Sequence, residues 1–235
     1  MTPSRTALIV AHGQPSDPEP AEAEIARLAA AVDALLPDWR VQSATLAAPG
    51  RLAERLAGLG PGGLVYPLFM AGGWFTRVHL PERLAQAGGA DWRVLAPFGE
   101  DPALQDLTVA LAREALARAG IAAAQGQILL AAHGSFRSPA PSQIARAMAK
   151  RLRDELGLAR VEPAFIDQSP QIAEVARNLG PGVIVLPFFA ARGGHVIDDL
   201  PAALAEAGFA GTVLDPVGLD PRVPGLIADA LTRAP

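Results

Sequence analysis

Short apolar runs alternate with helix-like patterns along the chain, and this alternation predicts an α/β fold built on parallel sheets. Runs such as residues 183–186 are apolar on both faces, which is typical of strands covered by helices on both sides. The predicted strands lie at residues 6–11, 41–46, 63–69, 93–97, 160–166 and 183–186. The predicted helices lie at residues 21–36, 51–57, 81–87 and 102–119, with a short helix near Leu200 and Pro201.

The second half of the chain repeats the first. LIVAHG from residue 8 matches LLAAHG from residue 129, and PFGEDP from residue 97 matches PVGLDP from residue 216. Pro67 and Pro81 match Pro187 and Pro201, so all four landmarks recur at a spacing of 119 to 121 residues. One shared period of this kind predicts two homologous halves.

We place the two predicted halves at residues 1–120 and 127–235, joined by a short linker. Each half is expected to be a three-layer α/β unit with a mostly parallel sheet of about four strands. We also expect the halves to face each other across a cleft, because such clefts are a usual place for a small-molecule site.

Composition removes several classes of function. A net charge of −4 gives no basic surface for nucleic acid or an anionic membrane. The absence of cysteine excludes disulfides, cysteine-based zinc sites and iron–sulfur clusters. No apolar run is long enough for a signal peptide or a membrane helix, so we expect a cytoplasmic protein. Nucleotide use is not expected, because the glycine-rich segment at residues 60–63 lacks the lysine and Ser/Thr of a P-loop.

Candidate chemistry gathers where the strands of the second half end. His133 follows the first strand, Asp167 the second, and His195 lies in the glycine-containing loop after the third. Ligands bind at this edge in open α/β sheets. Two histidines and a carboxylate without sulfur suit Fe²⁺, Co²⁺, Ni²⁺ or Zn²⁺, and an imidazole, with its ordinary pKa of about 6.5, also accepts protons at neutral pH. The alternatives are a loop hydrogen bond for His133 and an ordinary surface turn for His195.

The first half lacks most of this set. His12 is retained, but Phe75 stands at the position of His195, and an alanine stands at that of Asp167. We therefore predict a single active site on the second half. His12 is expected to hydrogen-bond within its own loop and to face apolar residues, among them Trp74 and Phe75, which form an apolar wall.

Two roles are open for Asp199, which follows His195 by four residues. Together with Asp198 it is placed to orient the imidazole of His195. Alternatively, it caps the helix that starts at Leu200 and Pro201. Its counterpart in the first half is His79.

Three motifs of the second half resemble those of the class II chelatases, in particular the long, two-repeat sirohydrochlorin chelatases of sirohaem and cobalamin synthesis. They are AHGS from residue 132, AFID from residue 164, and VLPFFAARGGHVIDDLP with its His-x-x-x-Asp-Leu-Pro ending. The resemblance covers nearly the whole chain. It implies ATP-independent insertion of Co²⁺, Fe²⁺ or Ni²⁺ into sirohydrochlorin or a related tetrapyrrole held between the halves. It assigns metal contact to His133 and His195, and it implies that Asp167 helps to accept pyrrole protons.

A tetrapyrrole with many carboxylates also needs polar and apolar contacts. The residues expected to contact it are Ser135, Arg192, Gly193, Gly194, Trp74 and Phe75, with Arg77 and Arg137 as further cations on the relevant loops. With both walls of the cleft in one chain, a monomer is as plausible as a homodimer.

Two other functions are compatible with the same residues. One is a tetrapyrrole or metal carrier without catalysis. The other is a hydrolase in which His133, His195 and Asp167 hold zinc. A serine hydrolase is not expected, because Ser135 does not lie in a Gly-x-Ser-x-Gly elbow.

Overall fold

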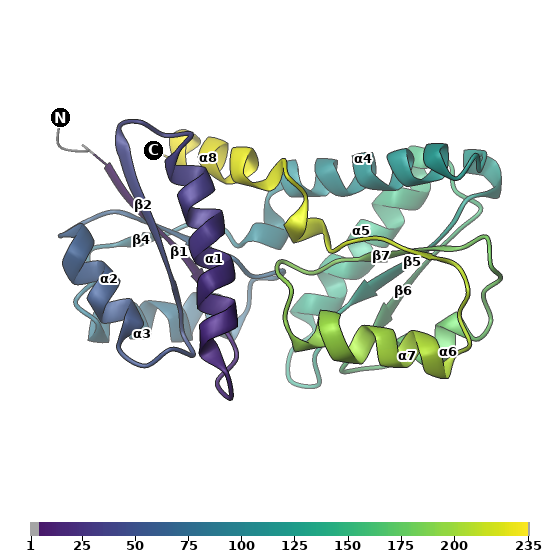
Figure 1. The fold of residues 1–235 in the computed structure, drawn as a ribbon, viewed down its shortest axis with the longest axis horizontal. Helices are drawn as coiled ribbons and strands as arrows, with labels where there is room; N and C mark the ends of the chain where they lie inside the picture. Colours follow the sequence, from purple (N-terminus) through teal and green to yellow (C-terminus); the bar gives the residue numbers. More distant parts are fainter. Residues whose placement is uncertain (1–4, 235) are drawn as a thin grey trace. The chain divides into compact units, whose positions relative to one another are not determined.

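Two parallel sheets of four strands each form the framework of the computed structural model, which describes residues 5–234 (Figure 1). The first sheet contains β1 (Arg5–Ala11), β2 (Trp39–Thr45), β3 (Leu64–Pro67) and β4 (Arg93–Val94), in the order β2-β1-β3-β4. The second contains β5 (Gln127–Ala132), β6 (Arg160–Phe165), β7 (Ile184–Pro187) and β8 (Thr212–Val213), in the equivalent order β6-β5-β7-β8. The predicted α/β fold of two homologous halves is confirmed.

Helices connect the strands, as the sequence pattern predicts. The α-helices are α1 (Pro18–Asp33), α2 (Arg51–Leu59), α3 (Leu80–Gln86), α4 (Pro102–Arg118), α5 (Ala140–Leu156), α6 (Ile172–Ala176), α7 (Leu200–Glu206) and α8 (Val223–Arg233). Short 3₁₀ turns occur at η2 (Phe98–Glu100), η3 (Ala123–Gln125) and η5 (Val217–Leu219). No helix within residues 5–234 is long and apolar enough to cross a membrane.

Each half also contains a π-helical turn that the sequence pattern does not reveal. η1 (Phe75–His79) precedes α3, and η4 (His195–Asp199) precedes α7. Each following α-helix has proline near its start, where the missing N–H interrupts the i→i−4 hydrogen-bond series. The amide of Leu200 bonds instead to the carbonyl of His195, five residues back, which is the π-helical pattern.

The first sheet is covered on both faces, which explains why its strands are apolar throughout. On one face, Leu8 and Val10 of β1 pack in a cluster with Leu56 of α2 and Leu84 of α3. On the other face lie α1 and α8, which contact each other at an angle (Figure 1). This arrangement makes three layers.

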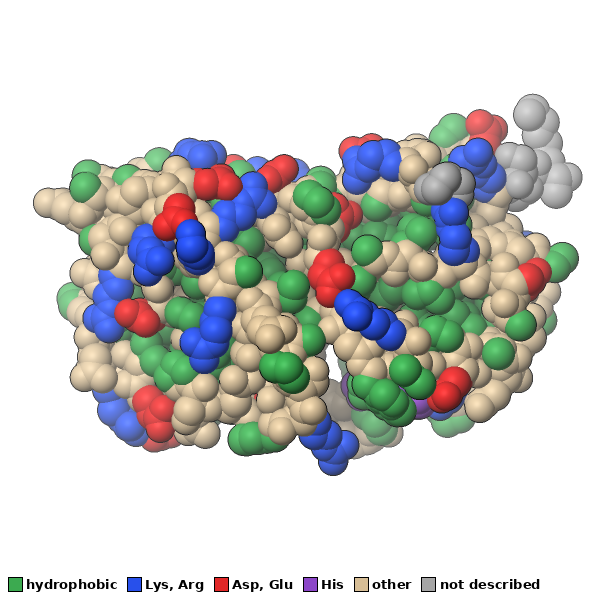
Figure 2. Space-filling view, turned by 180° about the vertical axis from the view of Figure 1, so that it is seen from behind, with side chains coloured by type: hydrophobic (Ala, Val, Ile, Leu, Met, Phe, Trp, Pro, Cys, Tyr) green, Lys and Arg blue, Asp and Glu red, His purple; other side chains and the backbone are tan. Residues whose placement is uncertain are grey.

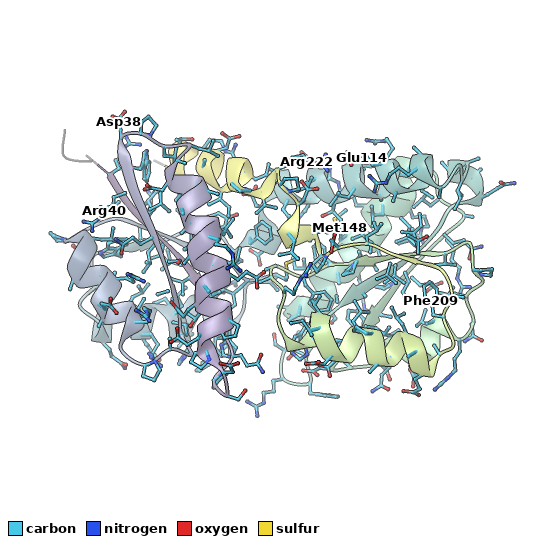
Figure 3. The ribbon with its side chains drawn as sticks, in the orientation of Figure 1. Asp38, Arg40, Glu114, Met148, Phe209 and Arg222 are labelled. Atoms are coloured by element: carbon cyan, nitrogen blue, oxygen red, sulfur yellow. The ribbon has the colours of Figure 1, made fainter. Side chains whose placement is uncertain are left out.

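The second sheet has the same three layers. Leu129 and Ala131 of β5 share a cluster with residues of α6 and α7, and Phe209 packs against it. The opposite face carries α4 and α5, and Met148 of α5 is buried there (Figure 3). Helix α4 therefore packs on the second sheet, although it completes the first sequence repeat.

Each repeat contributes its last helix to the other compact unit. One unit consists of the residues up to Asp101 together with those from Pro221 onward, and the other runs from Pro102 to Asp220. Helix α4 lies in the second unit, and α8 lies in the first. The boundaries of the two homologous halves, residues 1–120 and 127–235, remain a prediction. The packed units differ from these halves, because each contains the last helix of the other repeat.

Candidate active site

The carboxyl edge of the second sheet brings the predicted site residues together. Ala132 ends β5 beside Phe165, which ends β6, so His133 and the loop containing Asp167 emerge next to each other. The amide of Asp167 donates a 2.9 Å hydrogen bond to the carbonyl oxygen of His133. This bond continues the sheet pairing past the last strand residues.

A glycine after the histidine is required by this backbone. Gly134 has a φ of +72°, and a Cβ there would lie 2.7 Å from Cγ of Gln168. Gly13, which follows His12, has the equivalent φ of +75°. The His-Gly pair therefore has the same backbone turn in both halves, whatever chemistry the histidine performs.

The imidazoles of His133 and His195 form a close pair. Their ring centroids are 4.2 Å apart, and the rings are nearly perpendicular, at 87°. Each side chain is 42% exposed, so both rings are open to a ligand. The expectation that these two distant histidines meet through the fold is confirmed.

The hydrogen bonds of the two rings define which nitrogen is available. Nδ1 of His133 lies 2.9 Å from the carbonyl oxygen of Gly134, and Nδ1 of His195 lies 2.7 Å from Oδ2 of Asp199. A carbonyl oxygen only accepts, and an ionised carboxylate does the same, so both Nδ1 atoms carry the proton. In neutral imidazoles, each Nε2 then keeps its lone pair for a metal ion or a proton.

Asp199 orients His195 and does not cap a helix. It occupies the position before α7, but its side chain makes no capping hydrogen bond. The π-helical turn instead places residues four apart, His195 and Asp199, in hydrogen-bonding contact. Of the two roles considered for Asp199, capping is wrong and the orienting contact is present.

Asp167 lies beside the pair but contacts only one of its members directly. Its Oδ2 is 3.6 Å from Nδ1 of His133, and its side chain is 38% exposed. The carboxylate thus sits where it stabilises a positive charge on the His133 imidazole. Within residues 5–234, no group of three or more His, Asp or Glu side chains is arranged to hold a metal ion.

The other predicted contact residues have local roles in the structure. The hydroxyl oxygen of Ser135 accepts hydrogen bonds from the amides of Arg137 and Ser138, at 3.1 and 3.2 Å. Its own amide donates to Oε1 of Gln168, at 2.8 Å. Gln168, which the sequence analysis did not single out, therefore ties the loop after β5 to the loop after β6.

Arg192, Gly193 and Gly194 lie in the loop between β7 and η4. The guanidinium of Arg192 lies 3.3 Å from Oδ1 of Asp215, and its side chain is largely exposed. Neither Gly193 nor Gly194 has a positive φ. Gly194 already has helical angles, and η4 begins at the next residue, so the π-helical turn positions His195.

The equivalent edge of the first sheet carries an aromatic cluster. The ring of Phe75 lies edge-on to His12, with centroids 4.9 Å apart, and edge-on to His79, at 5.1 Å. Trp74 stacks on His79, at 5.0 Å. His12 thus faces Phe75, as the sequence predicts. Figure 2 shows purple histidine next to green hydrophobic side chains at the molecular surface.

Comparison with known proteins identifies relatives of both repeats. The CbiX family model matches residues 6–115 and again residues 127–234. A solved structure described as CbiX, the terminal enzyme for biosynthesis of siroheme in denitrifying bacteria, is 49% identical, with a TM-score of 0.91. The match covers 98% of this chain and 100% of that one. No curated protein sequence matches the chain.

Two structures of SirB from Bacillus subtilis share the fold at lower identity. The one with Fe³⁺ is 16% identical with a TM-score of 0.77, over 99% of this chain and 95% of the other. The sirohydrochlorin chelatase SirB of subspecies spizizenii, in complex with cobalt, is 17% identical with a TM-score of 0.69. That match covers 99% of this chain and 94% of the other.

Proposed function

The chain belongs to the CbiX family, and from this premise we propose that it inserts a divalent metal ion into sirohydrochlorin or a related tetrapyrrole without ATP. The relative that is 49% identical is described as the terminal enzyme of siroheme biosynthesis, which supports metal insertion as the reaction class. It favours a chelatase over the zinc hydrolase considered from the sequence. Co²⁺, Fe²⁺ and Ni²⁺ are the proposed metal substrates, because imidazole nitrogens bind all three.

The observation that carries this proposal is the perpendicular pair formed by His133 and His195. Both rings use Nδ1 for protein hydrogen bonds, so each keeps Nε2 for a ligand, and the two ring centroids lie only 4.2 Å apart. Two neutral imidazoles hold a borderline cation without the tight binding that thiolates give. Such a site delivers a metal ion and then releases it to the nitrogens of the macrocycle.

The same groups account for the protons. Insertion of M²⁺ into the free-base macrocycle releases two pyrrole protons. We assign their acceptance to the imidazoles, with Asp167 stabilising the cationic form of His133 from 3.6 Å. Asp199 plays the matching part for His195, because its carboxylate accepts the Nδ1 proton.

The remaining contacts are assigned to substrate binding. Arg192 is exposed beside the site loop and is proposed to receive a substrate carboxylate in exchange for Asp215. Ser135, Gly193 and Gly194 line the loops that carry the two histidines. Trp74 and Phe75 of the first half are proposed as an apolar wall for the macrocycle.

The test is metal insertion into sirohydrochlorin, followed by absorbance with Co²⁺ and with Fe²⁺. Wild type is compared with His195→Ala and with His12→Ala, its matched control from the first half. Insertion well above the uncatalysed rate, lost in His195→Ala and retained in His12→Ala, is the expected result. The reverse pattern would keep the activity but move the site to the first half.

A carrier gives a different signature in the same experiment. Wild type would then shift the absorbance of sirohydrochlorin on binding without accelerating insertion. That outcome would replace the enzymatic function with transport of the tetrapyrrole.

A further inference from the structure

Exposed large hydrophobic side chains are concentrated at strand ends. Residues 5–234 contain seven of them, and five lie on the loops or π-helical turns that carry the site histidines or their counterparts. These five are Trp74, Phe75, Val78, Phe136 and Ile197. Single exposed apolar side chains are ordinary, but a concentration at equivalent strand ends indicates a ligand-contacting surface.

Phe136 is the most exposed of the seven, at 79%. It follows His133 by three residues, which span at most about 11 Å even when extended. The turn is held by the hydroxyl of Ser135, which accepts the amides of Arg137 and Ser138. The bond from the Ser135 amide to Gln168 fixes this turn to the neighbouring loop. The aromatic ring is therefore presented to solvent by an ordered turn next to His133.

The two halves carry their exposed aromatic rings on different loops. In the first-strand loop, the repeat spacing of 121 places Pro15 opposite Phe136. In the third-strand loop, a spacing of 120 places Trp74 and Phe75 opposite Gly194 and a histidine. The second half has the imidazole of His195 in its third-strand loop, and its exposed aromatic ring, Phe136, lies in the first-strand loop instead. Both halves thus keep an aromatic surface at the same edge of the sheet.

We propose that Phe136 binds one face of the tetrapyrrole by ring stacking and so helps determine which macrocycles the site accepts. The inference rests on the proposed function, because it takes the substrate class from it. Conjugated planar rings stack on aromatic side chains in offset or edge-on geometries. The neighbouring cation, Arg137, is exposed on the same turn, where it suits the carboxylates at the edge of such a ligand.

The experiment compares wild type with Phe136→Ala, Phe136→Trp and Val213→Ala. Val213 is the control, since it is an exposed hydrophobic residue of the same unit that lies on β8 and not on a loop or turn that carries a site histidine. Two quantities are measured: the Kd for metal-free sirohydrochlorin, and kcat and KM for Co²⁺ insertion. Phe136→Ala is expected to raise both Kd and KM for the tetrapyrrole about tenfold, which corresponds to ~1.4 kcal/mol, with kcat unchanged. Phe136→Trp should bind as wild type does, and Val213→Ala should change nothing.

The outcomes separate this inference from the proposed function. If wild type inserts the metal but Phe136→Ala binds sirohydrochlorin as tightly, the role of Phe136 is overturned and the chelatase stands. If Phe136→Trp is as weak as Phe136→Ala, the ring is not a stacking surface, and the inference again fails. If wild type neither binds nor metallates sirohydrochlorin, the proposed function is wrong, and the role of Phe136 that depends on it is wrong as well.

Discussion

The two halves share a backbone at their strand ends but differ in the side chains placed on it. Each has a histidine and a positive-φ glycine after its first strand, and each has a π-helical turn after its third. The first residue of that turn is Phe75 in one half and His195 in the other; the last is His79 or Asp199. One turn therefore holds an aromatic cluster, and the other holds an imidazole backed by a carboxylate. The comparison shows that a few positions on a common frame decide where the chemistry resides.

The largest effect is expected from removing the imidazole that only the second half possesses. His195→Ala should lower kcat for Co²⁺ insertion roughly 1000-fold, because proton acceptance and metal contact both depend on this ring. The measurement is the steady-state rate with saturating sirohydrochlorin.

Its counterpart in the first half provides the control. Phe75→Ala removes an equally placed ring that packs on His12 and His79, so it should raise KM and leave kcat nearly unchanged. A loss of kcat in Phe75→Ala as large as that in His195→Ala would mean that both halves perform the chemistry.

The shared backbone itself can be tested at two equivalent glycines. A Cβ on Gly99 would lie 1.9 Å from the carbonyl oxygen of Met70, and one on Gly218 would lie 2.0 Å from that of Ala190. Gly99→Ala and Gly218→Ala should each lower the free energy of unfolding by about 3 kcal/mol. The clash of the added Cβ with a backbone carbonyl can be relieved only by a shift of the main chain. Urea denaturation measures this, with Gly180→Ala as a control that meets no neighbouring atom within 4 Å. A much smaller loss at one glycine would show that the two frames are not equally rigid.

A smaller effect is expected from Asp199, which acts through His195. Asp199→Ala should lower kcat about 30-fold, within the range typical of partners that orient a metal-contacting histidine. Asp199→Asn retains an oxygen that accepts the Nδ1 proton, so it should recover most of the activity. KM for sirohydrochlorin should not change in either variant.

The matched change in the first half is His79→Ala. Its ring stacks on Trp74 in the aromatic cluster of the first half, and the proposed chemistry does not use it, so kcat should be preserved. If Asp199→Asn is as impaired as Asp199→Ala, the negative charge rather than the orientation of the ring is what matters.

The sequence was sufficient for the fold and for the histidine pair because both depend on repeated patterns. The 120-residue period allows each half to be compared with the other, and that comparison singles out His195 against Phe75. Parallel strands end at one edge, so His133 and Asp167 had to lie close together. For Asp199 the sequence left two roles open, because a carboxylate four residues after His195 and just before a helix suits both a contact with the imidazole and a helix cap. Only the structure decides for the contact.

The exchange of α4 and α8 was equally invisible in the sequence. An amphipathic pattern shows that a helix buries one face, but it does not say against which sheet. Because α4 follows the first half in sequence, it was assigned there, whereas it packs in the second unit. Phe136 was missed for a related reason: a lone phenylalanine in a polar loop gives no periodic signal, and only its exposure makes it notable.

The smallest predicted effect concerns a buried contact that the second half lacks. The hydroxyl of Tyr66 in β3 lies 3.3 Å from Oδ2 of Asp101, the residue at which the chain leaves the first unit. The equivalent residue of β7 is Leu186, which offers no such bond to Asp220. Tyr66→Phe should therefore lower the free energy of unfolding by about 1 kcal/mol, as measured by urea denaturation. An unchanged free energy of unfolding would mean that the hydrogen bond from Tyr66 to Asp101 does not contribute to stability.

The pH dependence of this contact has a definite sign. Burial raises the pKa of the Tyr66 hydroxyl, and the negative charge of Asp101 raises it further. The native state thus keeps the phenol neutral, whereas the unfolded chain ionises it above about pH 10. The associated stability is present below that pH and falls as the pH rises through it. Because the chain has one tyrosine, tyrosinate absorbance reports on Tyr66 alone. It should appear only as the protein unfolds, and ionisation of the native protein near pH 10 would show that the first half does not bury this bond.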